Sequence, residues 1–510
     1  MSVDPARTSP SPTERPIGQV RGVRDWMPEE FARLEVLETL LLDRFARAGY
    51  APLRTPILEF TELHERKSGA GIVAKLFGVQ NGHHDPICLR PELTASIVRA
   101  YTAAEAAPPL PWRVSMAGPV FRYEKTPQAG HYREFTQVGV ELLGAPGPAA
   151  DAEVIALADW ALREAGISDA TLRVGHVGLI LEMFARSGLP PAARAALVEM
   201  LSEAAAEGRT VRALESALEG LSGWLRSGEE AEAILPTMGG ADDGGVDRLF
   251  RHLVPDITGR RSGHEIIGRL RRKWDLGHSL QAVLDRARDR IHELADLRGS
   301  ATAVLDRLAR EYEAVAPDSV AELRALLGLL EHYGLDPGRI ELDLGFSRGI
   351  GFYSQMIFEL IAPTPSGPVE VCGGGRYDGL ARVLGSDRDD RGVGFAFGLE
   401  RLWHVLEARG QGECVEVAPP QGLLVCAMTP EGLIGAIGLV GQLRPKGVRA
   451  VLEPERTAPE AIAHARRLGL RWVVEVKGRS LEDLILHRVH EGDETRVGLA
   501  RLCQLLGVGG

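Results

Sequence analysis

Residues 118–144 read GPVFRYEKTPQAGHYREFTQVGVELLG, with two alternating segments around the turn-rich stretch KTPQAGHY. Alternation on both sides of such a turn predicts a β-hairpin. Its polar side chains stand mostly at even separations, and therefore largely on one face: Arg122, Glu124, Arg133, Gln137 and Glu141. Cross-strand ion pairs on a half-exposed sheet are the alternative explanation for a single hairpin of this kind. Other stretches of the chain therefore decide whether the hairpin belongs to a site.

Three other stretches carry charged or polar residues into sheet-like or glycine-rich surroundings. LRPELT places Glu92 and Thr94 on one side of a short strand, and GFAFGLERL carries Arg401 into the start of a helix. LDLGFSRGIGFYSQMIFEL, residues 342–360, alternates apolar and small residues like a strand, yet holds Arg348 between two turn-prone positions. An arginine in such a place indicates a negatively charged partner.

Composition excludes several classes of protein. The 510 residues are 45% hydrophobic and 25% charged, enough for several hydrophobic cores. A net charge of -11 argues against wholesale phosphate binding, so a nucleic-acid partner would meet local basic patches. The five cysteines form no CxxC pair, which argues against a cysteine-rich zinc site and predicts a cytoplasmic location. The chain starts without the apolar core of a signal peptide, and its run GLIGAIGLVG is too short for a bilayer, so we expect no membrane segment.

Changes of pattern along the chain predict an α+β protein of four parts. Residues 1–18 are rich in Pro, Ser and Thr and are expected to form a disordered tail. Short β-rich runs between Gly and Pro turns predict an antiparallel sheet core over residues 19–170 and 336–412. Residues 171–335 carry a helical period and predict a mostly helical insertion. Residues 420–510 alternate strand and helix patterns, which predicts a small C-terminal α/β domain.

The chain resembles the class II aminoacyl-tRNA synthetase core, and specifically the histidyl-tRNA synthetase family, in five stretches. They occur in the family's order: LRPELT, GPVFRYE with YREFTQVGVE, RGIGFY, GGGRYDGL and GFAFGLERL. Five weak patterns in the right order are far more specific than any one of them. The resemblance covers roughly residues 20–145 and 340–408. It implies a sheet that binds ATP and histidine, on which the carboxylate of histidine attacks the α-phosphate.

The resemblance also implies roles for residues at matching positions. Arg122 and Arg348 would be catalytic, because negative charge accumulates on phosphoryl oxygens and fixed guanidinium groups stabilise it. Nucleotide binding would fall to Arg122, Glu124, Arg133 and Arg401. Histidine binding would fall to Glu92, Thr94, Gln137, Glu141, Tyr353, Gly373 and Gly375. Mg²⁺ would arrive with ATP, and we assign no metal site built by the protein.

Partners follow from the same resemblance. A ligase of this family would transfer the histidyl group to tRNA(His) and would be a homodimer. Pro56 interrupts the strand-like stretch YAPLRTPILEF, which indicates a sheet edge, and we expect the subunit contact around it. The basic residues within 259–274 are explained either by contact with an RNA acceptor stem or by a solvated helix face.

Two departures from the family's motifs keep a second function open. His131 stands where an arginine is usual near the terminal phosphates, and Gly351 stands where the family has an aspartate. The family includes a paralogue, the regulatory subunit of ATP phosphoribosyltransferase, which senses histidine, charges no tRNA and partners a catalytic subunit in histidine biosynthesis. A sensor has no physical need for a complete set of phosphate-binding cations. Arg122, Arg348 and Arg401 together therefore favour the ligase.

Overall fold

The computed structural model of the chain describes residues 17–68, 75–79, 86–124, 126, 130–186, 293, 297–346, 352–389, 391–412 and 422–508. These residues form two compact units, one within residues 1–415 and one within residues 416–510. Each unit has its own sheet and its own hydrophobic core.

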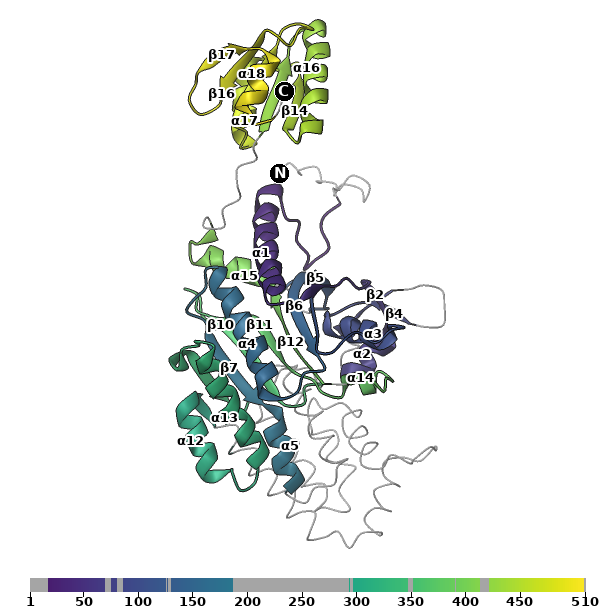
Figure 1. Cartoon of the computed structure of the whole chain (residues 1–510), viewed down its shortest axis with the longest axis vertical. Helices are drawn as coiled ribbons and strands as arrows, with labels where there is room; N and C mark the ends of the chain where they lie inside the picture. Colours follow the sequence, from purple (N-terminus) through teal and green to yellow (C-terminus); the bar gives the residue numbers. More distant parts are fainter. Residues whose placement is uncertain are drawn as a thin grey trace, which may run out of the picture. The chain divides into compact units, whose positions relative to one another are not determined.

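The first unit is built on a nine-stranded sheet with the strand order β1-β5-β6-β12-β11-β10-β7-β9-β8 (Figure 1). Neighbouring strands from β5 to β7 are antiparallel, whereas β1 pairs with β5 and β9 pairs with β7 in parallel. The strands are β1 (Ala51–Pro52), β5 (Trp112–Phe121), β6 (Glu134–Leu143), β7 (Thr171–His176), β8 (Arg298–Ser300), β9 (Ile340–Asp343), β10 (Met356–Ala362), β11 (Val369–Arg376) and β12 (Gly392–Gly398). The antiparallel sheet of an α+β core, expected from the sequence, is confirmed.

The hairpin predicted from residues 118–144 is formed by β5 and β6, with Val114 opposite Glu141. Val138 and Val140 of β6 are buried in the main hydrophobic core. Because successive side chains of a strand alternate between faces, Gln137 and Glu141 point to the other face of the sheet.

Helices α1 (Pro28–Arg47) and α4 (Gly147–Glu164) cover one face of the sheet, and α13 (Pro317–His332) packs against α4 (Figure 1). Helix α1 begins with a proline and two glutamates and ends with arginines, an order that suits the helix dipole. Its buried residues recur every three or four positions and form one apolar stripe: Leu34, Leu37, Leu41 and Phe45.

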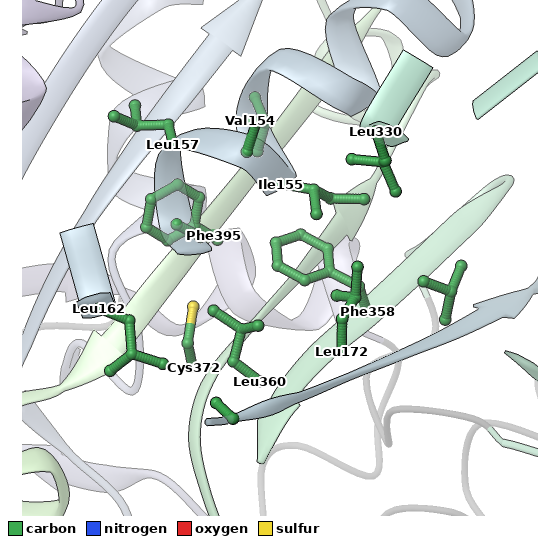
Figure 2. Close-up of a cluster of buried hydrophobic side chains, with 14 of the residues drawn as sticks. Val154, Ile155, Leu157, Leu162, Leu172, Leu330, Phe358, Leu360, Cys372 and Phe395 are labelled. Carbon is green, nitrogen blue, oxygen red and sulfur yellow. The ribbon is translucent and has the colours of Figure 1, made fainter. Parts of the chain in front are cut away.

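The main hydrophobic core fills the layer between these helices and the sheet. In Figure 2, Val154 and Ile155 of α4 lie near Phe358 and Phe395 from the central strands. The two phenylalanine rings meet edge to face, with centroids 6.3 Å apart. Large buried aromatic side chains dominate core energetics, so this layer fixes the central strands and the residues on their opposite face.

The opposite face of the sheet carries smaller elements. Helix α3 (Thr94–Ala103) packs its Ile97 against Val114 of β5, on the same face as Glu141. Near it lie the helices α2 (Thr61–Ser68) and α14 (Leu380–Val383) and a three-stranded sheet of β2 (Leu58–Phe60), β4 (Ile87–Leu89) and β3 (Phe77–Val79).

Most of the expected helical insertion, with the basic stretch 259–274, lies outside the described residues. In the described remainder of that range, β7 and β8 belong to the nine-stranded sheet, where each pairs with β9. They are followed by α5 (Val177–Arg186) and by α12 (Ala301–Glu311), and the short 3-10 helix Pro337–Arg339 leads into β9. The boundaries of the insertion stay a prediction.

The second unit contains a five-stranded mixed sheet in the order β14-β13-β15-β16-β17 (Figure 1). Helices connect its first three strands along the chain. Its elements are β13 (Gly422–Ala427), α16 (Pro430–Leu443), the 3-10 helix Arg444–Lys446, β14 (Arg449–Pro454), α17 (Ala458–Arg467), β15 (Trp472–Val476), β16 (Leu484–Arg488), β17 (Glu494–Val497) and α18 (Leu499–Leu505). Thr457 and Glu460 form a capping box at the start of α17. The small α/β fold expected for this region is confirmed. Among the described helices, none combines the length and the apolar character that a membrane crossing requires.

Candidate functional site

A cavity that is open to solvent lies on the face of the large sheet opposite α4. Its walls come from β6, β11, β12, the segment after β5 and the start of α3. Most of the predicted site residues line it: Glu92, Thr94, Arg122, Glu124, Gln137, Glu141, Tyr353, Gly373 and Arg401. The fold therefore brings together residues from both halves of the expected core.

Glycines form part of the cavity floor and leave room for two functional side chains. Gly394 of β12 lies opposite Glu141, and a Cβ atom at Gly394 would lie 1.9 Å from Glu141 Oε2. A Cβ atom at Gly375 would lie 2.9 Å from the ring of Tyr353. Gly375 itself is not among the lining residues and supports Tyr353 from the sheet side. Close approach of a neighbouring side chain explains glycine at both positions.

One end of the cavity, here called the carboxylate end, is built around Glu92, Thr94, Glu141, Tyr353 and Tyr377. The Tyr377 hydroxyl donates a short hydrogen bond to Glu141. Burial raises the pKa of the Glu141 carboxyl to about 7, although hydroxyl donors from Thr94 and Tyr377 oppose that rise. Glu141 is therefore poised between its neutral and ionised forms at neutral pH.

Glu92 is held in the opposite electrostatic state. Its Oε2 lies 2.8 Å from the ammonium of Lys67, and its Oε1 accepts a hydrogen bond from Ala95 N at 3.1 Å. The side chain of His64 lies 3.7 Å from the same carboxylate. Burial alone raises the pKa of Glu92, but Lys67 and then His64 outweigh it and bring the pKa to about 2. Glu92 is consequently ionised at every physiological pH.

The other end, here called the arginine end, contains Arg122, Glu124, His131, Glu370 and Arg401. Arg122 adjoins the carboxylate end, because its Nε donates to the carbonyl of Pro91 at 2.8 Å. Its guanidinium lies over the Phe135 ring, 5.3 Å from the centroid. These contacts orient the guanidinium beside the residue that precedes Glu92.

Arg401 comes from the first turn of α15 (Leu399–Ala408) and completes the arginine end. It donates to the carbonyl of Glu370 at 3.1 Å and to the carbonyl of Gly130 at 3.4 Å, and it lies 3.6 Å from the Glu370 carboxylate. Burial, followed by the charge of Arg401, lowers the pKa of His131 below its usual value. The imidazole of His131 is therefore mostly neutral at pH 7.

Arg133 lies outside the residues that line the cavity. Its Nε and Nη2 donate to the carbonyl of Glu124 at 3.0 and 2.9 Å, and its Nη1 donates to the carbonyl of Arg21 at 3.0 Å. The guanidinium also stacks over Tyr123, 4.6 Å from the ring centroid. Arg133 therefore links the hairpin to the N-terminal segment through hydrogen bonds.

Two predicted positions and the question of a metal site complete the comparison with the sequence. Arg348 and Gly351 lie outside the described residues, so their placement stays a prediction. Phe352, which follows them, stacks on Tyr353 with ring centroids 4.4 Å apart. Among the described residues, no group of three or more His, Cys, Asp or Glu side chains is arranged to hold a metal ion.

Two functional residues at or behind the carboxylate end were not assigned from the sequence. Tyr377 stands in the quoted stretch GGGRYDGL, so its motif was found but its side chain was not assigned. Lys67 lies in the polar stretch TELHERKS, which has the composition of a solvent-exposed helix face. Only the packing of α2 against α3 shows that its side chain is 1% exposed.

Known proteins resemble this chain along most of its length. A family model described as histidyl-tRNA synthetase matches residues 22–235 and 245–402. A histidine–tRNA ligase from Thermococcus kodakarensis is 30% identical over 468 residues, covering 91% of this chain and 92% of the relative. An ATP phosphoribosyltransferase regulatory subunit from Moorella thermoacetica is 32% identical over 463 residues, covering 90% of this chain and 99% of the relative. Apo histidyl-tRNA synthetase from S. aureus shares the fold, with a TM-score of 0.64 at 22% identity, over 96% of this chain and 99% of that one.

Proposed function

This chain belongs to the histidyl-tRNA synthetase family, and from that premise we propose that it activates histidine with ATP and transfers the histidyl group to tRNA(His). One observation carries the proposal. Arg122, after β5, and Arg401, on α15, line the same cavity as the carboxylates Glu92 and Glu141. A binder of histidine alone needs the carboxylates, whereas a reaction at a phosphate needs the guanidinium groups as well.

The cavity supports an order of events in the reaction. The carboxylate end receives histidine, whose ammonium and imidazole find acceptors in Glu92 and Glu141. The carboxylate of histidine then attacks the α-phosphate of ATP, and pyrophosphate leaves. Arg122, which adjoins the carboxylate end, stabilises the charge that develops on the α-phosphoryl oxygens. We assign the same task to Arg348, on the strength of the family motif alone.

In this proposal the arginine end binds the remaining phosphates and the adenine base of ATP. We assign Arg401 to the terminal phosphate and Glu124 to the adenine on the strength of the family motifs, and both residues line the cavity. Mg²⁺ would be brought by ATP and would neutralise phosphate charge during attack. Glu370 also lines the arginine end, and carboxylate oxygens are ligands that Mg²⁺ accepts.

We further propose a cytoplasmic homodimer. Strand pairing places six apolar side chains on one face of the three-stranded sheet: Leu58, Phe60, Phe77, Val79, Ile87 and Leu89. None is fully buried, and Leu58 and Phe60 are 50% and 57% exposed. The face directly follows Pro56, and a second copy of the chain is its expected partner. Cys88, Cys426 and Cys503 are free and buried, in keeping with a reducing compartment.

Light scattering tests the dimer. Leu58→Glu with Phe60→Glu should convert the protein to a monomer, because both charges would be buried in the contact. Val383→Glu is a matched control, since this exposed residue of α14 lies outside the three-stranded sheet. A double variant that keeps the mass of the wild type would contradict the proposed contact.

A second function has specific support. The relative with 32% identity is a regulatory subunit of ATP phosphoribosyltransferase, and His131 supplies no fixed charge to the arginine end. In that case the chain would bind histidine at the carboxylate end, charge no tRNA, and partner a catalytic subunit of ATP phosphoribosyltransferase.

Histidine-dependent exchange of pyrophosphate into ATP separates the two functions. A ligase should catalyse the exchange, and aminoacylation of tRNA(His) should follow. Binding of histidine without any exchange would overturn the ligase and leave the regulatory function. The absence of histidine binding would overturn both.

A further inference from the structure

Lys67 is a buried cation that neither proposed function assigns. It lies in the last turn of α2, and its side chain is 1% exposed. Its ammonium lies 2.8 Å from Glu92 Oε2 and 3.8 Å from the centroid of the Phe352 ring. Among the described residues, no further polar group forms a hydrogen bond with this ammonium. An ammonium is rarely buried so completely unless its charge serves a nearby group.

The two contacts of Lys67 join separate walls of the carboxylate end. Glu92 leads into α3, where it also accepts from the backbone nitrogen of Ala95. Phe352 belongs to the segment before β10 and stacks on Tyr353. A cation placed between a carboxylate and an aromatic face is attracted to both. Lys67 therefore holds two lining elements in register without itself lining the cavity.

We propose that Lys67 is the positioning residue of the histidine pocket: it keeps Glu92 ionised and oriented before the ligand arrives. The inference rests on histidine binding, which the ligase and the regulatory function share, and not on the choice between them.

Removal of Lys67 has two opposing effects on histidine binding, because Lys67 supports Glu92 but also repels the ammonium of the ligand. Burial is the largest influence on Glu92 and favours its neutral form, and Lys67 is the largest influence against it. Without Lys67, a buried Glu92 would hold a proton and present one hydroxyl donor to an ammonium that needs acceptors. The nearby charged groups that face this pair are His64, Glu141 and Arg122. Loss of the acceptor charge outweighs the relief of repulsion, since a neutral carboxyl forms no ion pair with the ammonium and offers it only a carbonyl oxygen.

Binding of two ligands tests the proposal. L-histidine carries an α-ammonium, whereas 3-(imidazol-4-yl)propionate lacks it and keeps the ring and the carboxylate. Lys67→Met should weaken histidine binding at pH 7 at least about tenfold, the value of a hydrogen bond to a charged group. It should change binding of the propionate by less than about twofold, because an ammonium that is absent cannot report on Glu92. Lys67→Arg should retain histidine binding, since a guanidinium also pairs with the carboxylate.

Further variants distinguish a loss of charge on Glu92 from a general destabilisation of the fold. Lys67→Met can destabilise the fold by leaving Glu92 buried without a partner, whereas Lys67→Met with Glu92→Gln removes both charges. Urea unfolding between pH 5 and pH 8 should show Lys67→Met gaining a pH dependence that the double variant lacks. Arg66→Met, which removes a cation from the exposed face of the same helix, is the matched control and should leave the profile unchanged.

The outcomes are distinct. Equal loss of both ligands in Lys67→Met would make Lys67 a merely structural residue and overturn the proposal, as would histidine binding that matches the wild type. Wild-type protein that binds no histidine would instead overturn the proposed function. In that event the unfolding profiles still report whether Lys67 keeps Glu92 ionised.

Discussion

The two ends of the cavity hold their charges in different ways. At the carboxylate end, Glu92 is compensated inside the protein by Lys67, and Glu141 is bonded to the Tyr377 hydroxyl. At the arginine end, Arg401 donates hydrogen bonds to two backbone carbonyls, and the Glu370 carboxylate lies 3.6 Å away. Carbonyls orient a guanidinium without cancelling its charge. Both ends are therefore organised before a ligand binds, but at the arginine end the Glu370 carboxylate offsets part of the charge of Arg401, for which a phosphate would compete.

The largest expected effect separates the two ends completely. Arg122→Ala should lower pyrophosphate exchange by about 10²–10³-fold, the usual cost of removing one group that stabilises charge in a transition state. Histidine binding, measured by calorimetry, should persist because Glu92 and Glu141 remain. Arg307→Ala, which removes an exposed arginine of α12, is the matched control. Exchange at the wild-type rate in Arg122→Ala would show that this guanidinium does not face the reacting phosphate.

The second effect concerns the opposite pH responses of the two carboxylates. Glu141 has a pKa of about 7 in the folded state, above its usual 4.5, so its contribution to stability is present below pH 4.5 and is lost as pH rises through 7. Glu92, with a pKa of about 2, contributes stability above pH 4.5 that is lost as pH falls through 2.

Glu141→Gln should therefore remove a decline in the free energy of unfolding between pH 4.5 and 7. The decline is on the order of 3 kcal/mol, from about 1.4 kcal/mol for each unit of pKa difference. Urea unfolding at several pH values measures it. Glu62→Gln, at an exposed carboxylate of α2, should leave the profile unchanged. Parallel profiles for the wild type and Glu141→Gln would mean that Glu141 is ionised throughout.

The fold and the cavity were predicted from the sequence to different degrees. Alternation along residues 134–143 predicted the hairpin, because the side chains of β6 face either the buried core or the cavity. Motif order predicted that Arg122 and Arg401 meet, and both line the cavity. The hairpin depends on local periodicity, which a sequence displays directly, whereas the meeting of the two arginines was implied by the resemblance to the family.

Other features depended on packing that no local pattern displays. TELHERKS has the composition of a solvated helix, yet α2 turns Lys67 towards Glu92. The resemblance implied that Arg133 binds the nucleotide, and that role stays a prediction. Its actual partners include the carbonyl of Arg21, which is distant in the chain and offers a backbone atom that carries no sequence signal.

A smaller effect is expected from removing the link that Arg133 forms between the hairpin and the N-terminal segment. Arg133→Ala removes donors to the carbonyls of Glu124 and Arg21, so the segment between β5 and β6 should loosen at the arginine end. We expect the free energy of unfolding to fall by about 1–3 kcal/mol, because several hydrogen bonds of a charged group are lost. The KM for ATP in the exchange reaction should rise, and histidine affinity should stay constant. Loss of exchange at saturating ATP would instead make Arg133 a ligand of the reacting phosphate.

The smallest effect adds charge to the arginine end. Burial and Arg401 lower the pKa of His131, so its imidazole contributes little positive charge at pH 7. His131→Arg supplies a permanent cation, and the KM for ATP should fall about two- to fivefold, since a solvent-accessible charge pair contributes roughly 0.5–1 kcal/mol. The gain is limited because the new cation would also repel Arg401.

The pH dependence of ATP binding in the wild type tests whether positive charge at His131 strengthens ATP binding. Its imidazole gains a proton as pH falls through the lowered pKa of His131, so the part of ATP binding that depends on His131 should strengthen as pH falls below 6.5. His131→Gln should lose that pH dependence, whereas His332→Gln, at an exposed residue of α13, should keep it. If His131→Arg weakened ATP binding, the imidazole would be an acceptor that the nucleotide requires, and the arginine end would work by hydrogen bonding more than by charge.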